Sequence, residues 1–170
     1  MELRGEGIAL RPWREDDAES VYVACQDAEI LRWMPAIPRP YTRADARAFV
    51  TGRLDLGPHQ FAITEADRPF GSIGMQVNEP RIGHIGYWCA REARGRGVTT
   101  RALRLIAKYA LEELKLERLE LITDPDNRAS QRVAEKVGFR REGVLRSHLL
   151  HPDGRRRDSI IFSLLPGELR

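Results

Sequence analysis

The stretch Arg94-Gly95-Arg96-Gly97-Val98-Thr99 stands between an apolar run at 81–89 and a periodic segment at 98–114. In that segment, apolar residues recur with the period of an amphipathic helix of about four turns. A helix start offers unpaired backbone N–H groups and the positive end of the helix dipole, which together favour a phosphate group. Gly95 and Gly97 let the backbone approach that phosphate closely, and the two arginines add positive charge. The junction therefore predicts a phosphate-binding loop.

Two common phosphate-binding motifs do not fit this spacing. A P-loop needs GxxxxGK[ST], and no lysine follows these glycines. A dinucleotide-binding turn needs GxGxxG, and Thr100 stands at the third glycine. Taken alone, the loop is equally consistent with a glycine-rich turn that only precedes a helix.

The rest of the chain predicts strands and helices on both sides of the loop. Alternating or continuous apolar runs indicate strands near 8–13, 60–65, 70–77, 81–89 and 119–123, and two more flank a turn at 151–154. Capping residues indicate helices from Asp16 or Asp17, from Thr42 to about Leu56, over 98–114, and from Asn127 to Gly138. The segment 33–41 carries three prolines and predicts a loop. This order predicts one α/β domain with a mixed sheet.

A second motif follows about thirty residues after the loop. It reads Asn127-Arg128-Ala129-Ser130, then Val133-Ala134-Glu135-Lys136-Val137-Gly138-Phe139, then Glu142-Gly143. The pattern RGxGxxT, a long helix and NxxSxxVxEKxGFxxEG resembles the GNAT superfamily of N-acetyltransferases. Within it, the chain looks most like the RimJ/RimL branch, which acetylates protein N-termini. The segments 10–13 and 158–165 also resemble that branch, so the resemblance runs from about residue 8 to residue 165.

The resemblance implies a fold in which the loop has a defined place. That fold is α/β (α+β): a single GNAT-like N-acetyltransferase domain over residues 1–170, with a mixed, mostly antiparallel sheet of about seven strands flanked by about four helices. In the family, the strand before the glycine loop and the strand after its helix splay apart. By position, we expect a V-shaped gap between the strands near 84–90 and 118–123.

The same resemblance implies acetyl-CoA as the acetyl donor, lying in the gap, with no metal. Its pantetheine arm would pair with backbone groups of Trp88, Cys89 and Ala90. Its pyrophosphate would be held by the backbone donors of Arg94, Gly95, Arg96, Gly97, Val98 and Thr99. Asn127 would contact the pantetheine arm while capping its own helix, and Ser130 would also contact the cofactor. Thr99 departs from the Ala or Gly usual in the family, and Arg101 from the Glu common in this branch.

Direct acetyl transfer needs a neutral amine, a polarised thioester carbonyl and a proton for the leaving thiolate. Many members of the superfamily place a tyrosine seven residues after the asparagine as the proton donor, and here that position is Ala134. The RimJ/RimL branch is thought to use the serine of NxxS, so the resemblance assigns this role to Ser130. The residue type is equally consistent with a first-turn serine that bonds to the backbone.

The base that takes the amine proton is not identified by any motif. Histidine suits this role, and we take His148, on the strand after Glu142-Gly143, as the candidate. His84 is an alternative; either residue could be a surface or structural histidine, and proton relay to bulk water could suffice. A covalent route through Cys89 is a further alternative, although no histidine is paired with it in the sequence.

The acceptor is not identified by the motifs, which serve the shared cofactor. The 33–41 loop carries Trp33, Met34 and Tyr41, in the region where the family commonly builds its acceptor pocket. Exposed aromatic side chains would suit a peptide terminus or an apolar small amine, and buried ones would form a satellite core. We therefore expect acetyl transfer from acetyl-CoA to a primary amine, of a protein N-terminus or a small molecule, in a ternary complex. The alternative is a non-catalytic acyl-CoA-binding sensor of the same fold.

Composition excludes several other classes of protein. A net charge of +3, from 28 basic and 25 acidic residues, is too balanced to indicate a nucleic-acid partner. No apolar run of about eighteen residues is present that could span a membrane, and the N-terminus lacks the apolar core of a signal peptide. Cys25 and Cys89 fit free thiols in a reduced compartment. We expect a cytoplasmic protein. Dimers are common among relatives, so a homodimer is a further possibility.

Overall fold

The computed structural model describes residues 1–170 and contains eight strands, five α-helices and two 3-10 helices. The strands are β1 (Leu3–Gly5), β2 (Ile8–Arg11), β3 (His59–Glu65), β4 (Arg68–Glu79), β5 (Ile82–Cys89), β6 (Arg118–Thr123), β7 (Arg140–Leu150) and β8 (Arg156–Leu164). The helices are η1 (Glu15–Asp17), α1 (Ala18–Ala24), α2 (Ala28–Trp33), α3 (Arg43–Val50), η2 (Arg91–Ala93), α4 (Val98–Glu112) and α5 (Arg128–Val137). None of these helices has the length and apolar character needed to cross a membrane.

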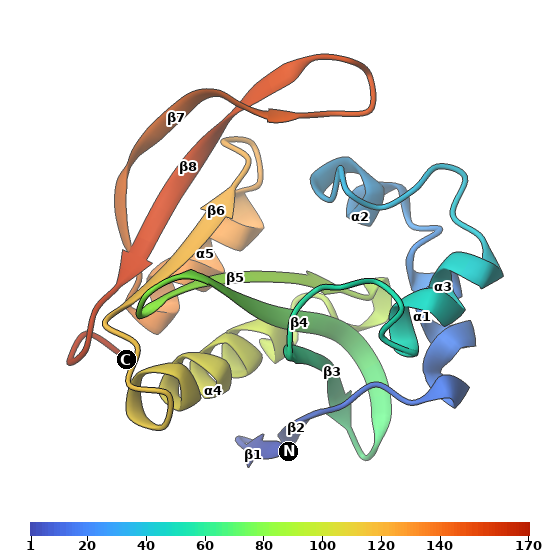
Figure 1. The fold of residues 1–170 in the computed structure, drawn as a ribbon, viewed down its shortest axis with the longest axis horizontal. Coiled ribbons are helices and arrows are strands. Elements are labelled where there is room, and N and C mark those ends of the chain that lie inside the picture. Colours follow the sequence, from blue (N-terminus) through green and yellow to red (C-terminus); the bar gives the residue numbers. More distant parts are fainter.

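All eight strands form one sheet, in the order β1-β2-β3-β4-β5-β6-β8-β7. Every neighbouring pair is antiparallel except β5 and β6, which run parallel. The parallel pairing extends only from Ile82↔Arg118 to Ile85↔Leu121, although both strands continue beyond it. Figure 1 shows the two strands diverging, with β8 and β7 on the far side of β6. The mixed sheet and its V-shaped splay confirm the expected fold class.

Two apolar clusters hold the elements together. The main core lies where α4 and α5 pack against the sheet, and on α4 it includes the buried Val98, Ala102 and Ile106, as the periodic pattern predicts. A smaller cluster joins α1, α2 and α3 beside the C-terminal end of β5 (Figure 1). The three short helices are thereby attached to the strand that forms one side of the splay.

The junction after α5 is fixed by one glycine. Gly138 follows the helix with a φ of 108°, in the region that favours glycine. A Cβ at this position would lie 2.3 Å from the backbone oxygen of Glu168, so any other residue would displace the C-terminal segment. The expected helix end at Gly138 is confirmed.

The structure differs from the sequence-based expectation at three elements. β1 is an additional strand of three residues, too short to show a pattern. α2 is an additional helix of six residues, capped by the side chain of Asp27, which accepts hydrogen bonds from the N–H groups of Glu29 and Ile30. α3 ends at Val50 rather than near Leu56, followed by Gly52 with a φ of 70°. The sheet therefore has eight strands rather than seven, and there are five α-helices rather than four.

Candidate active site

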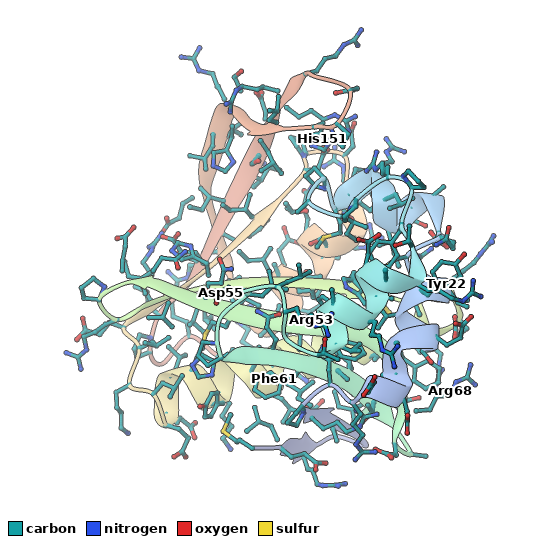
Figure 2. The ribbon with its side chains drawn as sticks, turned by 45° about the vertical axis from the view of Figure 1, so that its right-hand side comes forward. Tyr22, Arg53, Asp55, Phe61, Arg68 and His151 are labelled. Atoms are coloured by element: carbon teal, nitrogen blue, oxygen red, sulfur yellow. The ribbon has the colours of Figure 1, made fainter.

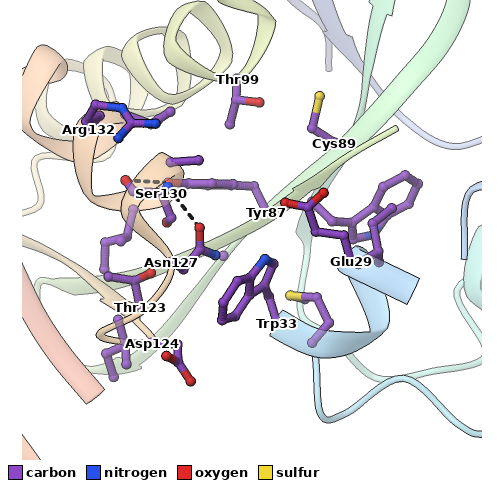
Figure 3. A pocket seen from close by; sticks show the side chains of 18 of the residues that line it. Glu29, Trp33, Tyr87, Cys89, Thr99, Thr123, Asp124, Asn127, Ser130 and Arg132 are labelled. Atoms are coloured by element: carbon purple, nitrogen blue, oxygen red, sulfur yellow. Dashed lines mark hydrogen bonds between the residues drawn. The ribbon is translucent and has the colours of Figure 1, made fainter. Parts of the chain in front are cut away.

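A cavity of about 380 Å³ lies where β5 and β6 separate (Figure 3). Its lining comes from α2, β5, the loop before α4, the end of β6, α5 and the β7–β8 hairpin. In Figure 3, Thr99 lies on one side of this space and Trp33 and Asp124 on the other. The cavity therefore connects the glycine loop with the region between α2 and the hairpin.

β5 presents a free backbone edge to the cavity. Residues 86–89 pair with β4 along one edge, while their other edge has no strand beside it because the pairing with β6 stops at Ile85. Trp88 and Cys89 lie in this segment and line the cavity. Ala90 does not line it, and its N–H donates to a β4 carbonyl at 2.8 Å. An extended chain with amide groups could pair with residues 86–89, whereas the N–H of Ala90 is already bonded to β4 and is not free.

The loop at 94–99 presents backbone donors at the start of α4. Gly95 and Gly97 have φ values of 75° and 71°, and no atom lies within 4 Å of the position that a Cβ would occupy at either residue. The backbone N–H groups of residues 95–100 donate to no backbone carbonyl. With the helix dipole behind them, these donors form a site suited to a phosphate or pyrophosphate.

The arginine side chains of the loop are held by acidic partners. Arg94 forms ion pairs with Asp27 at 3.2 Å and with Glu29 at 2.8 Å. Arg96 pairs with Glu65 and does not line the cavity. Because these charges are already compensated, the anion site depends mainly on backbone donors, and Arg96 can contribute through its N–H group alone.

α5 begins at the cavity, where Asn127 caps it by accepting a hydrogen bond from the N–H of Ser130 at 3.1 Å. The hydroxyl oxygens of Ser130 and Tyr87 lie 2.9 Å apart, and both residues line the cavity (Figure 3). Burial raises the pKa of Tyr87 above its ordinary value, so the phenol keeps its proton at neutral pH. Ala134 is fully buried in the main core. β5 therefore supplies a phenolic hydroxyl that no sequence motif indicates.

Neither cysteine has the surroundings of a reactive thiolate. Cys89 lines the cavity, but burial raises the pKa of its thiol, against smaller opposing effects from Thr99 and Arg94. Cys25 is buried among the short helices, where burial raises its pKa to about 11. Both thiols are free, and both favour the protonated form at neutral pH.

Between α2 and the end of β6, the lining is apolar and acidic. α2 contributes Glu29 and Trp33, and Met34 follows directly, so part of the region expected to be a loop forms a helical wall. Tyr41 is instead buried in the smaller core cluster. Asp124, after β6, adds a second carboxylate to the lining (Figure 3). This combination suits a cationic group carried on an apolar body.

Of the four histidines, only His151 lines the cavity. His148 lies outside it, with Nδ1 3.1 Å from the hydroxyl oxygen of Ser159, which does line it. His84 also lies outside, with Nδ1 3.1 Å from a carboxylate oxygen of Glu120. No sequence motif indicates His151 as a site residue. It stands at a Pro-Asp-Gly turn, and such a turn needs no functional reason to occur.

The structure brings most of the predicted site residues to one cavity. Those that line it are Trp88, Cys89, Arg94, Gly95, Gly97, Val98, Thr99, Asn127 and Ser130. Those outside it are Ala90, Arg96 and His148. No group of three His, Cys, Asp or Glu side chains is arranged to hold a metal ion.

Residues 8–140 match the family model described as the acetyltransferase (GNAT) domain. The chain belongs to this family. GNAT proteins are acyltransferases that use acetyl-CoA, so the enzyme class predicted from the two motifs is confirmed.

Relatives of this GNAT chain include ribosomal-protein acetyltransferases. YdaF of Bacillus subtilis is 41% identical over 93 residues. These residues make up 55% of this chain and 49% of YdaF, so the match spans about half of that relative. The ribosomal-protein-serine acetyltransferase of Escherichia coli is 31% identical over 154 residues, which cover 83% of each chain. The structure of Mycobacterium smegmatis RimJ in complex with CoA-disulfide has a TM-score of 0.83 at 26% identity, covering 99% of this chain and 87% of RimJ. The resemblance to the RimJ/RimL branch is confirmed.

Proposed function

We propose that this GNAT chain transfers the acetyl group of acetyl-CoA to a primary amine by direct attack in a ternary complex. The observation that carries the proposal is the single cavity described above. It joins an anion-binding helix start, a free strand edge and an acidic, apolar region. These features match, in order, a pyrophosphate, a pantetheine arm with two amides, and a cationic amine.

At the donor end, the backbone N–H groups of residues 95–100 would bind the pyrophosphate. The free edge at Trp88 and Cys89 would pair with the pantetheine amides as an added strand does. Asn127 would contact the same arm from the start of α5. The thioester would then lie between β5 and α5, near the hydroxyls of Tyr87 and Ser130.

Transfer forms a bond between the amine nitrogen and the thioester carbon and breaks the bond between that carbon and sulfur. The departing sulfur needs a proton, and Ser130 is the proposed donor. The Tyr87 hydroxyl, 2.9 Å away, would hold the serine in place, and the serine oxygen would regain its proton from the attacking nitrogen. Burial favours the protonated form of the Cys89 thiol, which is a poor nucleophile. The proposed route therefore contains no acetyl-cysteine step.

At the acceptor end, Asp124 and Asp158 favour a group that arrives as an ammonium ion. Trp33 and Met34 offer apolar contact to the body that carries it. The name of the Escherichia coli relative, a ribosomal-protein-serine acetyltransferase, supports a protein acceptor, and an apolar small amine fits the same features. The homodimer and the cytoplasmic location stay predictions.

Release of free CoA thiol from acetyl-CoA, measured with a panel of N-terminal peptides and small primary amines, tests the proposal. We expect release that depends on the amine and an acetylated product of the expected mass. The buried alanine at position 134, where many GNAT proteins carry a tyrosine, favours a second candidate, a non-catalytic acyl-CoA sensor. Tight CoA binding without release for any amine would favour that candidate.

The glycine loop gives the sharpest test of donor binding. In Gly97→Val, a side chain would project toward the proposed phosphate site from a backbone with a φ of 71°. We expect calorimetry to show a roughly 10- to 100-fold loss of CoA affinity, which is the effect of losing one or two charge-assisted hydrogen bonds to the phosphate. Gly52→Val is the matched control, because Gly52 has a φ of 70° and open surroundings outside the cavity. Unchanged CoA affinity in folded Gly97→Val would contradict the assignment.

A further inference from the structure

His151 is a buried histidine whose ring has no partner in the protein. Only 5% of the residue is exposed, and it lines the cavity. Its N–H donates to the carbonyl of Arg155 at 2.9 Å, and its carbonyl accepts from Gly154 at 2.9 Å, so the turn fixes its backbone. No side-chain hydrogen bond or ion pair involves the ring, in contrast to His84 and His148. Figure 2 shows His151 at the end of β7, where the hairpin faces α2.

A second unpartnered polar group lines the same cavity. Thr123, the last residue of β6, has a buried hydroxyl oxygen with no hydrogen-bond partner. It pairs through its backbone with Ile160 on β8, next to Ser159, which also lines the cavity. Buried polar groups are nearly always hydrogen-bonded, so the unpartnered hydroxyl of Thr123, beside a histidine ring that makes no hydrogen bond or ion pair, indicates a polar ligand there.

Charged groups reach this region from every neighbouring element. The carboxylates that line the cavity are Glu29 of α2, Asp124 after β6 and Asp158 of β8, and the cations are Arg94 of the loop and Arg132 and Lys136 of α5. On the hairpin, Arg157 lies 3.9 Å from Asp124 and 3.5 Å from Asp153. Glu29 is paired with Arg94, and Asp124 shares Arg157 with Asp153, so Asp158, which forms no ion pair, is the main carboxylate left to attract an ammonium group near the hairpin.

We propose that His151 is the catalytic base that takes a proton from the acceptor ammonium group, which Thr123 helps to position. This inference rests on the proposed acetyl transfer. The ammonium gives one proton to an unprotonated ring nitrogen of His151, and the freed lone pair attacks the thioester carbon. The carbon–sulfur bond breaks, the sulfur takes a proton from Ser130, and the remaining extra proton on nitrogen returns to the serine oxygen. His151 releases its proton to solvent, which leaves an amide, a free thiol and one proton.

The test is the pH dependence of acetyl transfer by His151→Asn. A positioned base contributes about 100-fold or more to a rate, so we expect kcat/KM for the amine to fall by about that factor near neutral pH. As the pH rises through the pKa of the acceptor amine, about 8 for an N-terminal amine and about 10 for an alkyl amine, the difference from wild type should shrink. The affinity for CoA, measured by calorimetry, should not change. Added imidazole should restore activity to His151→Gly.

The same change outside the cavity provides the control. His84→Asn should keep the wild-type pH profile, because His84 is paired with Glu120 and does not line the cavity. The inference is overturned if His151→Asn keeps the wild-type rate, or if its rate falls by the same factor at all pH values. It is also overturned if His148→Asn shows the pH-dependent loss of rate instead, since the His148 ring contacts Ser159 of the cavity. A wild-type protein that acetylates no amine would overturn the proposed function as well, so the two failures are distinguishable.

Discussion

Tyr87 and Ser130 stand 43 residues apart in the sequence and bring two hydroxyl groups together in the cavity. The Tyr87 hydroxyl is also 3.3 Å from the backbone oxygen of Ser130, so it has two acceptors on the first turn of α5. When the phenol donates to the serine oxygen, the serine proton is free to face the cavity. The pair therefore orients the group that we propose as the proton donor.

Truncation of the two hydroxyls should separate their roles. Ser130→Ala should lower kcat by about 100-fold, the typical contribution of a general acid, while leaving CoA affinity close to wild type. Tyr87→Phe should lower kcat by roughly tenfold, because it removes one hydrogen bond to the donor. The double variant should be little worse than Ser130→Ala, since residues that act as a unit are not additive. Tyr22→Phe, outside the cavity, is the control, and full activity in Ser130→Ala would exclude serine as the donor.

Cys89 gives a separate residue-level prediction. Burial raises the pKa of its thiol, so little thiolate is present at neutral pH to attack a thioester. Cys89→Ala should therefore retain turnover close to wild type, and mass spectrometry of the wild-type protein with acetyl-CoA should show no acetyl-enzyme. Loss of turnover in a folded Cys89→Ala protein would indicate a covalent route.

At the scale of elements, Glu142 at the start of β7 connects three strands. Its carboxylate accepts hydrogen bonds from Arg118 of β6 at 2.9 and 2.6 Å and from Ser163 of β8 at 2.6 Å. The Arg118 guanidinium, with help from Ser163, lowers the pKa of Glu142 to about 2. This contact holds together the strands on one side of the splay.

The lowered pKa predicts acid sensitivity with a defined sign. A carboxyl group whose pKa is lower in the folded state stabilises the protein above its unfolded pKa of about 4.3 and loses that effect as the pH falls toward the folded value. Thermal unfolding of Glu142→Gln should therefore change less than that of wild type between about pH 4.5 and about pH 2. Glu117→Gln, which removes an exposed pair with Arg81, should keep the wild-type slope. Equal slopes in all three proteins would contradict the prediction.

Long or strongly capped elements were predictable from the sequence, and short ones were not. α4 has fifteen residues and a clear apolar period, and the glycine loop precedes it in sequence, so both could be placed. β1 and α2 have three and six residues, which is too few for a period to be visible. The site follows the same rule: contiguous motifs located the donor end, while Tyr87 and His151 reach the cavity only through tertiary packing.

At the scale of the whole molecule, the cavity lies between two parts of one sheet. β5 forms one wall together with the short helices that pack beside it, and β6, α5 and the hairpin form the other. The main core runs beneath both, since it includes Ile85 of β5, Leu121 of β6 and Ile106 of α4. A ligand in the cavity therefore contacts both walls, and its binding should stabilise the whole chain against unfolding.

CoA should accordingly raise the unfolding free energy by mass action. At a free concentration about 100 times Kd, the expected gain is about 2.7 kcal/mol, which corresponds to roughly 5–11 °C in Tm for a chain of this size. The shift should be absent or small in Gly97→Val at the same CoA concentration and full in Gly52→Val. A full shift in Gly97→Val would place CoA binding elsewhere.

The two ends of the cavity differ in what they are made of. The donor end uses main-chain groups of residues 86–89 and 95–100, which most amino-acid exchanges leave in place. The acceptor end uses side chains, such as Trp33, Met34 and Asp124, which a single exchange replaces. Descendants of one ancestral gene can therefore diverge in what they modify while they continue to consume the same acetyl donor.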